Sequence, residues 1–215
     1  MDAVKIQARV DRGYGIAAKK VGQLCEIRRP WRAVQPIGAE ASLGRIMAFF
    51  DPDYKFQARR PSLYGKPLFG VAIDRTNVRI GDYLLGAHDT WFLAGIEPLL
   101  PTMGVKCNVV MAVSRPGPVL VPGRNPYSGR TTATDAPMMA GWPASILIGG
   151  RTQAGRANLP GDVPDRGAQM LVPWWPGVTM RTSDRVSDDQ GRVWNVSEAE
   201  LTDLGWRVEL VLSVA

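Results

Sequence analysis

One stretch of sequence occurs twice and decides the fold class. Residues 79–84 read Arg-Ile-Gly-Asp-Tyr-Leu, and residues 181–186, which lie 102 positions later, read Arg-Thr-Ser-Asp-Arg-Val. The same spacing relates Trp91–Gly95 to Val193–Ser197. Since strand, turn and strand recur in the same order, we interpret the pattern as a duplicated β unit. The alternative is one continuous antiparallel barrel, whose hairpins resemble each other only because all hairpins do.

A glycine and a long alternating strand close each copy. Side chains at every second position of a strand point to the same face, and here these positions are apolar. They are Val105, Cys107, Val109, Met111 and Val113 in the first copy, and Trp206, Val208, Leu210, Leu212 and Val214 in the second. We therefore predict that Val78–Val113 and Val178–Val214 fold as superposable β units that bury these two sets.

The composition bounds the size and class of the protein. The chain has 215 residues, of which 45% are apolar and 21% charged, so it can form one or two small domains with a buried core. Its 23 glycines and 17 prolines favour a soluble, turn-rich and β-rich protein. A large multi-domain protein and wholesale disorder are excluded. No apolar stretch follows the first five residues, so we expect no secretory signal and synthesis in the cytoplasm.

An apolar stripe with helical spacing opens the chain. Its members recur every three or four residues: Ile6, Val10, Tyr14, Ala17 and Val21. Gly13 and Gly15 lie in the middle of the stripe, and glycine weakens a helix by about 1 kcal/mol relative to alanine. We therefore expect a broken helix, or a helix followed by a loop.

The predicted organisation has four parts. Residues 1–22 form an N-terminal helical or arm segment, and residues 23–113 form the first β unit, with a long irregular insertion at 30–66. The Pro- and Gly-rich residues 114–142 form a linker arm, and residues 143–215 form the second β unit. The predicted fold class is mainly β, with two small SH3-like or OB-like β-barrel units in tandem, an N-terminal helix-like segment and long irregular arms.

Residues that carry catalysis or bind metals are sparse. The chain has one histidine, His88, in a turn, and two isolated cysteines, Cys25 and Cys107. No phosphate-binding glycine loop, dinucleotide fingerprint or nucleophile elbow occurs. The acidic residues gather at spacings that fit no metal-binding loop: Asp188, Asp189, Glu198, Glu200 and Asp203. We therefore expect no enzymatic activity, no cofactor and no metal site.

The positive charge is concentrated in the first third of the chain. Residues 1–66 carry 13 Lys and Arg against 6 Asp and Glu, whereas residues 67–215 carry 13 against 14. Arginines and an aromatic ring gather there as candidate interface residues: Arg28, Arg29, Trp31, Arg32, Arg59 and Arg60. Such a group suits either stacked bases and phosphates or a protein partner. Because lysines are few and the second part is near neutral, we favour protein partners over nucleic acid and expect no membrane contact.

The repeated hairpin resembles a known family. The stretch Arg181–Val186, the turn with Asp189 and Gly191, and Val193–Val196 resemble the C-terminal hairpin of small β-barrel proteins from tailed bacteriophages, the head–tail connector or stopper class. Residues 79–82 match this pattern as well. The stretches Asp11–Ala18 and Glu97–Pro101 are also similar to phage structural proteins.

This resemblance implies a non-enzymatic virion protein that is made in the cytoplasm of a host bacterium. It implies self-association of six or twelve copies into a ring on the tail axis, with neighbouring virion proteins of the neck, tail tube or baseplate as partners. The neck is the position we expect, as head–tail connector or adaptor, and a ring around the tail tube or in the baseplate is the first alternative. A tandem-barrel nucleic-acid-binding module is the second.

Overall fold

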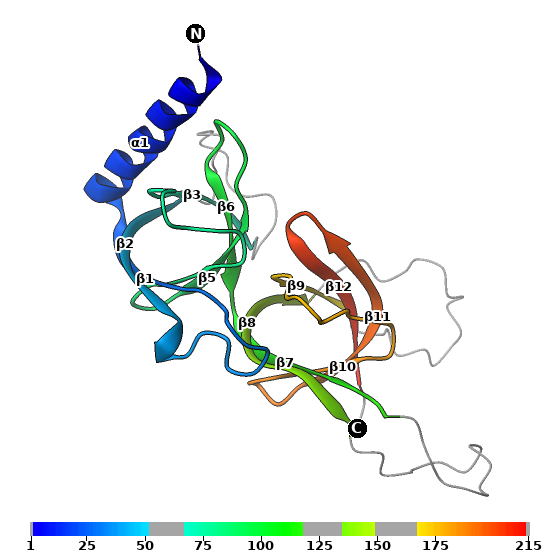
Figure 1. The fold of residues 1–215 in the computed structure, drawn as a ribbon. Helices are drawn as coiled ribbons and strands as arrows, with labels where there is room; N and C mark the ends of the chain where they lie inside the picture. The colour runs from blue at the N-terminus through cyan, green and yellow to red at the C-terminus, as the bar shows by residue number, and fades with distance from the viewer. Residues whose placement is uncertain (1, 52–66, 118–134, 149–166, 214–215) are drawn as a thin grey trace, which may run out of the picture.

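The computed structural model describes residues 2–51, 67–117, 135–148 and 167–213 (Figure 1). Two closed β-barrels follow each other along the chain, and one helix precedes them. The prediction of a mainly β fold with tandem barrels and an N-terminal helix is therefore confirmed. The alternative of one continuous barrel is wrong, because two separate sets of six strands each close on themselves.

Helix α1 (Ala3–Val21) is continuous, so the predicted break is wrong. Asp2 caps its N-terminus by accepting a hydrogen bond from the Val4 backbone at 3.1 Å, and two lysines in the last turn suit the negative end of the helix dipole. Gly15 lies against Asp74 of the first barrel, where a Cβ would come within 3.6 Å of the Asp74 side chain. The cap and the packing of α1 on the barrel offset the weak helix propensity of Gly13 and Gly15.

Barrel 1 is built from six short strands. They are β1 (Gln23–Arg28), β2 (Ser42–Asp51), β3 (Leu68–Ala72), β4 (Tyr83–Leu85), β5 (Thr90–Gly95) and β6 (Thr102–Cys107), and a 3-10 turn, η1 (Ala39–Ala41), precedes β2. The barrel closes in the order β1-β2-β3-β6-β5-β4. Its interior is a cluster of buried apolar side chains that includes Cys25, Ile27, Val71, Leu84 and Leu93.

Barrel 2 repeats this arrangement. Its strands are β7 (Val109–Arg115), β8 (Ala136–Ile148), β9 (Gly167–Val172), β10 (Arg185–Asp188), β11 (Val193–Thr202) and β12 (Gly205–Leu212). The barrel closes in the order β10-β11-β12-β9-β8-β7. Read in reverse, with β7 equated with β1, this is the order of the strands in barrel 1. Trp206, Val208 and Leu210 are buried as predicted, Leu212 is partly buried, and Val214 lies outside the described residues.

The boundary between the units differs from the prediction. The alternating strand at 105–113 is divided at Asn108, so that β6 belongs to barrel 1 and β7 to barrel 2. Val105, Val109, Met111 and Val113 are buried in one apolar cluster and Cys107 is packed against it, although these residues lie on strands of two different barrels. The alternation continues through Asn108 because every second residue still faces the same apolar cluster, from the outer face of barrel 1 on β6 and from the interior of barrel 2 on β7, although the hydrogen-bonding partners change there.

Two predicted irregular regions contain strands. Of the predicted linker 114–142, its first two residues end β7 and residues 136–142 begin β8. Of the predicted insertion 30–66, residues 42–51 form β2, which pairs with both β1 and β3. Tertiary pairing therefore overrides the turn-rich composition in both regions.

Each barrel contains the same ion pair between a buried aspartate and an arginine. Asp82 accepts hydrogen bonds from Nε and Nη2 of Arg29 at 2.7 and 2.8 Å, and Asp184 accepts the same two from Arg115 at 2.7 and 2.8 Å. Each aspartate also accepts the backbone N–H of the residue three positions earlier, at 2.8 Å. The repeat in the sequence is thus a repeat in structure.

The turn before each aspartate also has the same backbone form. Gly81 and Ser183 have left-handed φ angles of 89° and 74°, and their backbone N–H groups donate at 2.8 Å to Leu93 and Val196. These bonds equate Leu93 with Val196, and therefore Phe92 on β5 with Asn195 on β11. The predicted alignment of Trp91–Gly95 with Val193–Ser197 is therefore wrong by one residue, because the spacing between the copies is 103 here and not 102.

The outer face of β4, β5 and β6 packs against barrel 2. Tyr83, Phe92 and Val105 point away from the interior of barrel 1 and are buried in one cluster with Trp142 of β8. The Tyr83 hydroxyl donates a hydrogen bond of 2.8 Å to the Pro143 carbonyl within this interface. An apolar core therefore joins the two barrels into one body.

The corresponding outer face of barrel 2 is polar. The equivalents of Tyr83, Phe92 and Ala94 are Arg185, Asn195 and Ser197, and these three are exposed. At these three described positions barrel 2 therefore lacks the apolar side chains with which barrel 1 packs on its neighbour.

Candidate interaction surface

Two of the predicted interface residues are bound within the chain. Arg28 pairs with Glu26 at 3.1 Å and donates to the Ile37 carbonyl at 2.7 Å, which ties the end of β1 to the loop that follows. Arg29 is held by the buried Asp82, as described above. The hydrogen bond that Arg29 donates to Asp82 is the main reason that the pKa of Arg29 is raised, so this guanidinium stays charged. Both arginines organise the loop on which Trp31 lies.

Trp31 and Arg32 form an exposed pair on this loop. The Trp31 side chain is 52% exposed, and the Arg32 guanidinium lies over its ring at 4.5 Å from the centroid. Arg32 is fixed in turn by Glu40 at 2.7 Å. Arg59 and Arg60 lie outside the described residues. A fixed aromatic ring with an adjacent guanidinium is a preorganised contact for a protein partner.

The same loop also crosses to barrel 2. The Ala33 carbonyl accepts hydrogen bonds from the Trp142 indole at 2.7 Å and from the Ala140 backbone at 3.0 Å, and the Gln35 backbone donates to Ala140 at 2.8 Å. This part of the predicted irregular insertion therefore docks on barrel 2 of its own chain.

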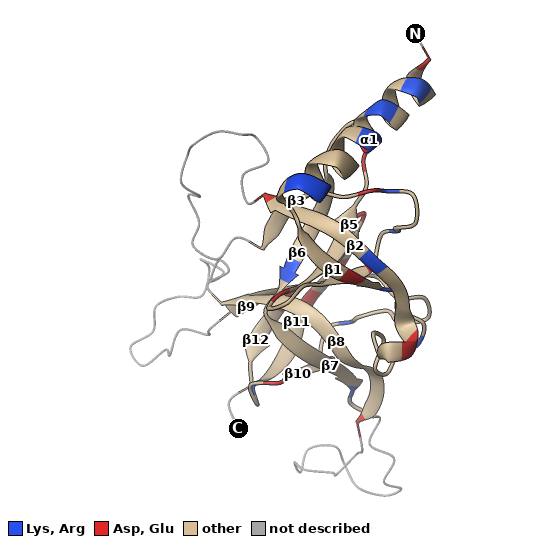
Figure 2. Ribbon diagram, turned by 90° about the vertical axis from the view of Figure 1, so that its left-hand side faces the viewer, with Lys and Arg blue, Asp and Glu red and all other residues tan. Residues whose placement is uncertain are grey.

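Helix α1 forms a second exposed surface (Figure 2). Lysines and arginines recur along the helix, which extends from barrel 1 past the ends of β2 and β3 in both views (Figures 1 and 2). Ala18 is the only fully buried residue of this 19-residue helix, and Val4 is 74% exposed. A helix gains most of its stability in proteins from packing of its apolar face, so α1 has an unusually small share of such contacts.

A wide groove of about 710 Å³ lies between the N-terminal half of α1 and the loop that joins β5 to β6. Apolar side chains dominate its walls, with Val4 and Ile6 on the helix and Pro98 and Leu99 on the loop. No sequence pattern indicated this groove. The stretch Glu97–Pro101 was singled out in the sequence, but nothing there indicated that this loop would lie beside α1.

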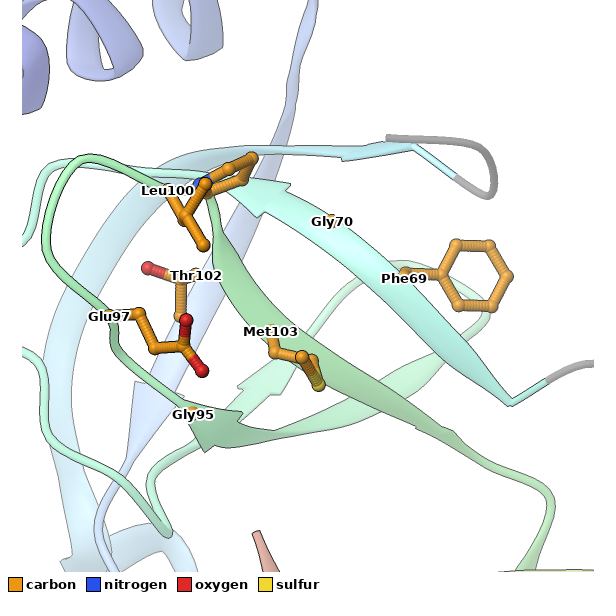
Figure 3. A pocket seen from close by; sticks show the side chains of 8 residues that line it. Phe69, Gly70, Gly95, Glu97, Leu100, Thr102 and Met103 are labelled. Atoms are coloured by element: carbon orange, nitrogen blue, oxygen red, sulfur yellow. The ribbon is translucent and has the colours of Figure 1, made fainter. Parts of the chain in front are cut away.

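A smaller cavity of about 50 Å³ lies beneath the same loop (Figure 3). Phe69, Leu100, Met103 and Glu97 are among the eight residues that line it. Its volume is that of one or two water molecules, so it is too small for an organic substrate.

The residues considered for chemistry are dispersed. His88 is exposed in the turn between β4 and β5, and Cys25 and Cys107 are free thiols in different parts of barrel 1. Burial raises the pKa of Cys25 to about 11, and it raises that of Cys107 further, so both thiols are protonated and unreactive at neutral pH. In the part of the chain that the structure describes, no three His, Cys, Asp or Glu side chains come together as they would around a metal ion.

Two further results bear on function. Among the described residues, no helix has the length and apolar character that crossing a membrane requires. No family model, curated protein or solved structure matches the chain.

Proposed function

We propose that this chain is a non-enzymatic structural protein of a tailed-bacteriophage virion, made in the cytoplasm of the host bacterium. In this proposal several copies form a ring on the tail axis, in the neck of the particle, as a head–tail connector or adaptor. The observation that carries the proposal is helix α1, which extends from the two packed barrels and has most of its surface uncovered by its own chain.

The two-barrel body supports this role. Tyr83, Trp142 and the hydrogen bonds of Ala33 join the barrels through a buried apolar core and a crossing loop. A subunit that transmits force along a particle needs such a fixed internal geometry. The contacts between subunits then fall to elements that project from the body, as α1 and the Trp31 loop do.

The same elements support the alternatives to different degrees. A ring around the tail tube or in the baseplate would use the same projecting helix, and imaging of intact particles with labelled protein distinguishes these positions. The nucleic-acid-binding alternative is supported by the exposed cations of α1, whereas Arg28 and Arg29 are already engaged within the chain.

The test is the assembly state of the purified chain, measured by sedimentation velocity and negative-stain microscopy. We expect rings, and expect Trp31→Ala to weaken assembly about 30-fold, which corresponds to the roughly 2 kcal/mol of an interface hot spot. Trp174→Ala is the matched control, since Trp174 is similarly exposed, at 54%, but lies on barrel 2. A chain that remains monomeric at high concentration and binds DNA with a steep salt dependence would refute the proposal.

A further inference from the structure

We propose that the cationic face of helix α1 binds the phosphate backbone of double-stranded DNA without regard to base sequence. The cationic face is the set of exposed positive side chains that share one side of the helix: Lys5, Arg9, Arg12, Lys19 and Lys20. The inference goes beyond the proposed function and does not depend on ring formation, because it leaves the other sides of α1 and the Trp31 loop for contacts between subunits.

One side of α1 carries all of its positive residues. At 3.6 residues per turn, these five residues fall within about 100° of the helix circumference. Ile16 is the sixth residue on this arc, and the buried Ala18 lies on the opposite side of the helix. The one acidic residue of the helix, Asp11, lies outside the arc and pairs with Arg75. The face is therefore uniformly positive.

The described part of the chain does not neutralise these cations. None of the five forms an ion pair with another described residue. Lys19 lies near an opposite charge, because the pKa of Asp74 is lowered first by its hydrogen bonds from Thr76 and further by the charge of Lys19. Lys5, Arg9 and Arg12 are therefore the cations whose removal tests the proposal.

The spacing of the cations suits a long polyanion. Lys5, Arg12 and Lys19 are seven residues apart, so they follow one line along the helix at intervals of about 10.5 Å. The whole face, from Lys5 to Lys20, is about 22 Å long. Duplex DNA carries one negative charge per about 1.7 Å of its axis, so over this length it offers more phosphates than the face has cations. Each cation can therefore meet a phosphate.

The shape of the helix surface also allows a close approach. Ala8 and Gly13 border the cationic face and are exposed, and a Cβ added to Gly13 would meet no atom within 4 Å. No bulky side chain at these two positions holds a phosphate away from the helix. The N-terminal part of α1 extends away from the barrels in both views, so the barrels do not block a duplex, whose major groove of about 12 Å admits an α-helix (Figures 1 and 2).

Other partners fit this face less well. Protein interfaces are depleted in lysine and centre on aromatic side chains, whereas the face has three lysines and no aromatic ring. A helix that lies on a membrane needs a broad apolar surface beside its cations, and the arc supplies only Ile16. A second copy of the same face is repelled by its like charge. Duplex DNA is therefore the occupant that the observations favour.

Binding of the full chain to a fluorescently labelled duplex of about 30 base pairs, measured by anisotropy over a range of salt concentrations, tests the proposal. The helix variant carries Lys5→Gln, Arg9→Gln and Arg12→Gln, and glutamine preserves helix propensity. Five phosphate contacts predict a slope of log K against log salt of about −4.5 for the wild type, and two contacts predict about −1.8 for the variant. At low salt the variant should bind at least tenfold more weakly. Two duplexes of unrelated sequence should bind the wild type within about threefold of each other, because phosphate contacts carry no sequence information.

A control variant removes the same charge from another surface. It carries Arg181→Gln, Arg185→Gln and Arg207→Gln, at three exposed positions in or beside the strands of barrel 2. It should bind the duplex within about twofold of the wild type, and an equal loss in both variants would overturn the inference. Circular dichroism should show the same helix content in both variants as in the wild type.

The outcomes separate this inference from the proposed function. Rings that bind no duplex, or that bind it equally well in the helix variant, would overturn the inference and leave the ring proposal intact. A monomer that binds the duplex through α1 would support the inference and refute the ring proposal, and a monomer that binds no duplex would refute both.

The same measurements identify a different occupant of the face. The helix variant should assemble as the wild type does, and loss of assembly would assign the face to contacts between subunits and overturn the inference. Tighter binding of phosphatidylserine vesicles or of poly-glutamate than of the duplex, at equal charge and salt, would assign the face to a membrane or to an acidic protein and would also overturn it.

Discussion

Replacing Arg115 by methionine removes one of the two repeated ion pairs and leaves its aspartate buried. Asp184 is 2% exposed and accepts both of its short side-chain hydrogen bonds from Arg115. In Arg115→Met only the backbone N–H of Arg181 still donates to this carboxylate. Arg115 also donates to the Thr179 carbonyl, so the loop before β10 loses its second contact as well.

The expected loss of folding free energy follows from the unequal burial of the two side chains. Removing one member of a buried ion pair typically costs 3–5 kcal/mol, because the remaining charge stays desolvated. We expect about 3 kcal/mol, the low end of this range, because the Arg115 side chain is 34% exposed and water can approach the site it leaves. In a chain of this length each kcal/mol lowers Tm by about 2–4 °C, so Tm should fall by about 6 °C or more.

Urea unfolding followed by tryptophan fluorescence measures this difference. Arg207→Met is the matched control, because Arg207 and Glu200 form an ion pair in which both side chains are more than half exposed, and it should cost less than about 1 kcal/mol. Arg29→Met, the equivalent change in barrel 1, should cost the same as Arg115→Met to within about 1 kcal/mol, given the matching distances. If Arg115→Met were no more costly than Arg207→Met, the buried pair would not stabilise barrel 2.

Three further predictions concern single buried groups. Tyr83→Phe removes the hydrogen bond to Pro143 between the barrels and should cost about 1 kcal/mol in urea unfolding, whereas an unchanged midpoint would mean that water replaces the bond. Because burial raises the pKa of Cys25 to about 11, this thiol should react with a disulfide reagent at pH 8 only after unfolding, and rapid labelling of the native chain would contradict its burial. Burial alone would raise the pKa of Asp188, but hydrogen bonds from Arg192 and Trp194 outweigh it and lower the pKa. The charged Asp188 therefore stabilises the fold above its ordinary pKa, near 4, and this contribution is lost as the pH falls below that value. Asp188→Asn should lower the free energy of unfolding in urea at pH 7 and change it little at pH 3. An equal loss at both pH values would contradict the lowered pKa.

The sequence contained enough information for the inward-facing residues but not for the strand partners. Alternation alone identified Val109, Met111 and Val208 as buried, because a strand repeats its facing every two residues. It did not distinguish β6 from β7, since Asn108 falls within an unbroken alternation. That division depends on two hydrogen bonds between Asn108 and Ile146, which lies 38 residues away.

The sequence identified residues of the candidate surface but not the contacts that they make. Arg29 was identified by its charge, yet its role is set by Asp82, 53 residues later in the chain. The turn that carries Asp82 was itself part of the repeated stretch, so the two observations were available but nothing in the sequence connected them. Trp31 differs, because its exposure follows from a loop that Arg28 and Arg32 fix locally.

Comparison of the two barrels separates what maintains the fold from what is available for function. The interior apolar positions and the Arg–Asp pair occur in both copies, which is expected if they are needed to close a barrel of this kind. The features that differ are helix α1, which precedes barrel 1, the apolar outer face of β4–β6, and the long β11–β12 hairpin of barrel 2. The apolar outer face already has a partner, because it packs on barrel 2. Helix α1 remains, and because most of its residues are exposed, it is the element of this comparison that is available for a contact outside the chain.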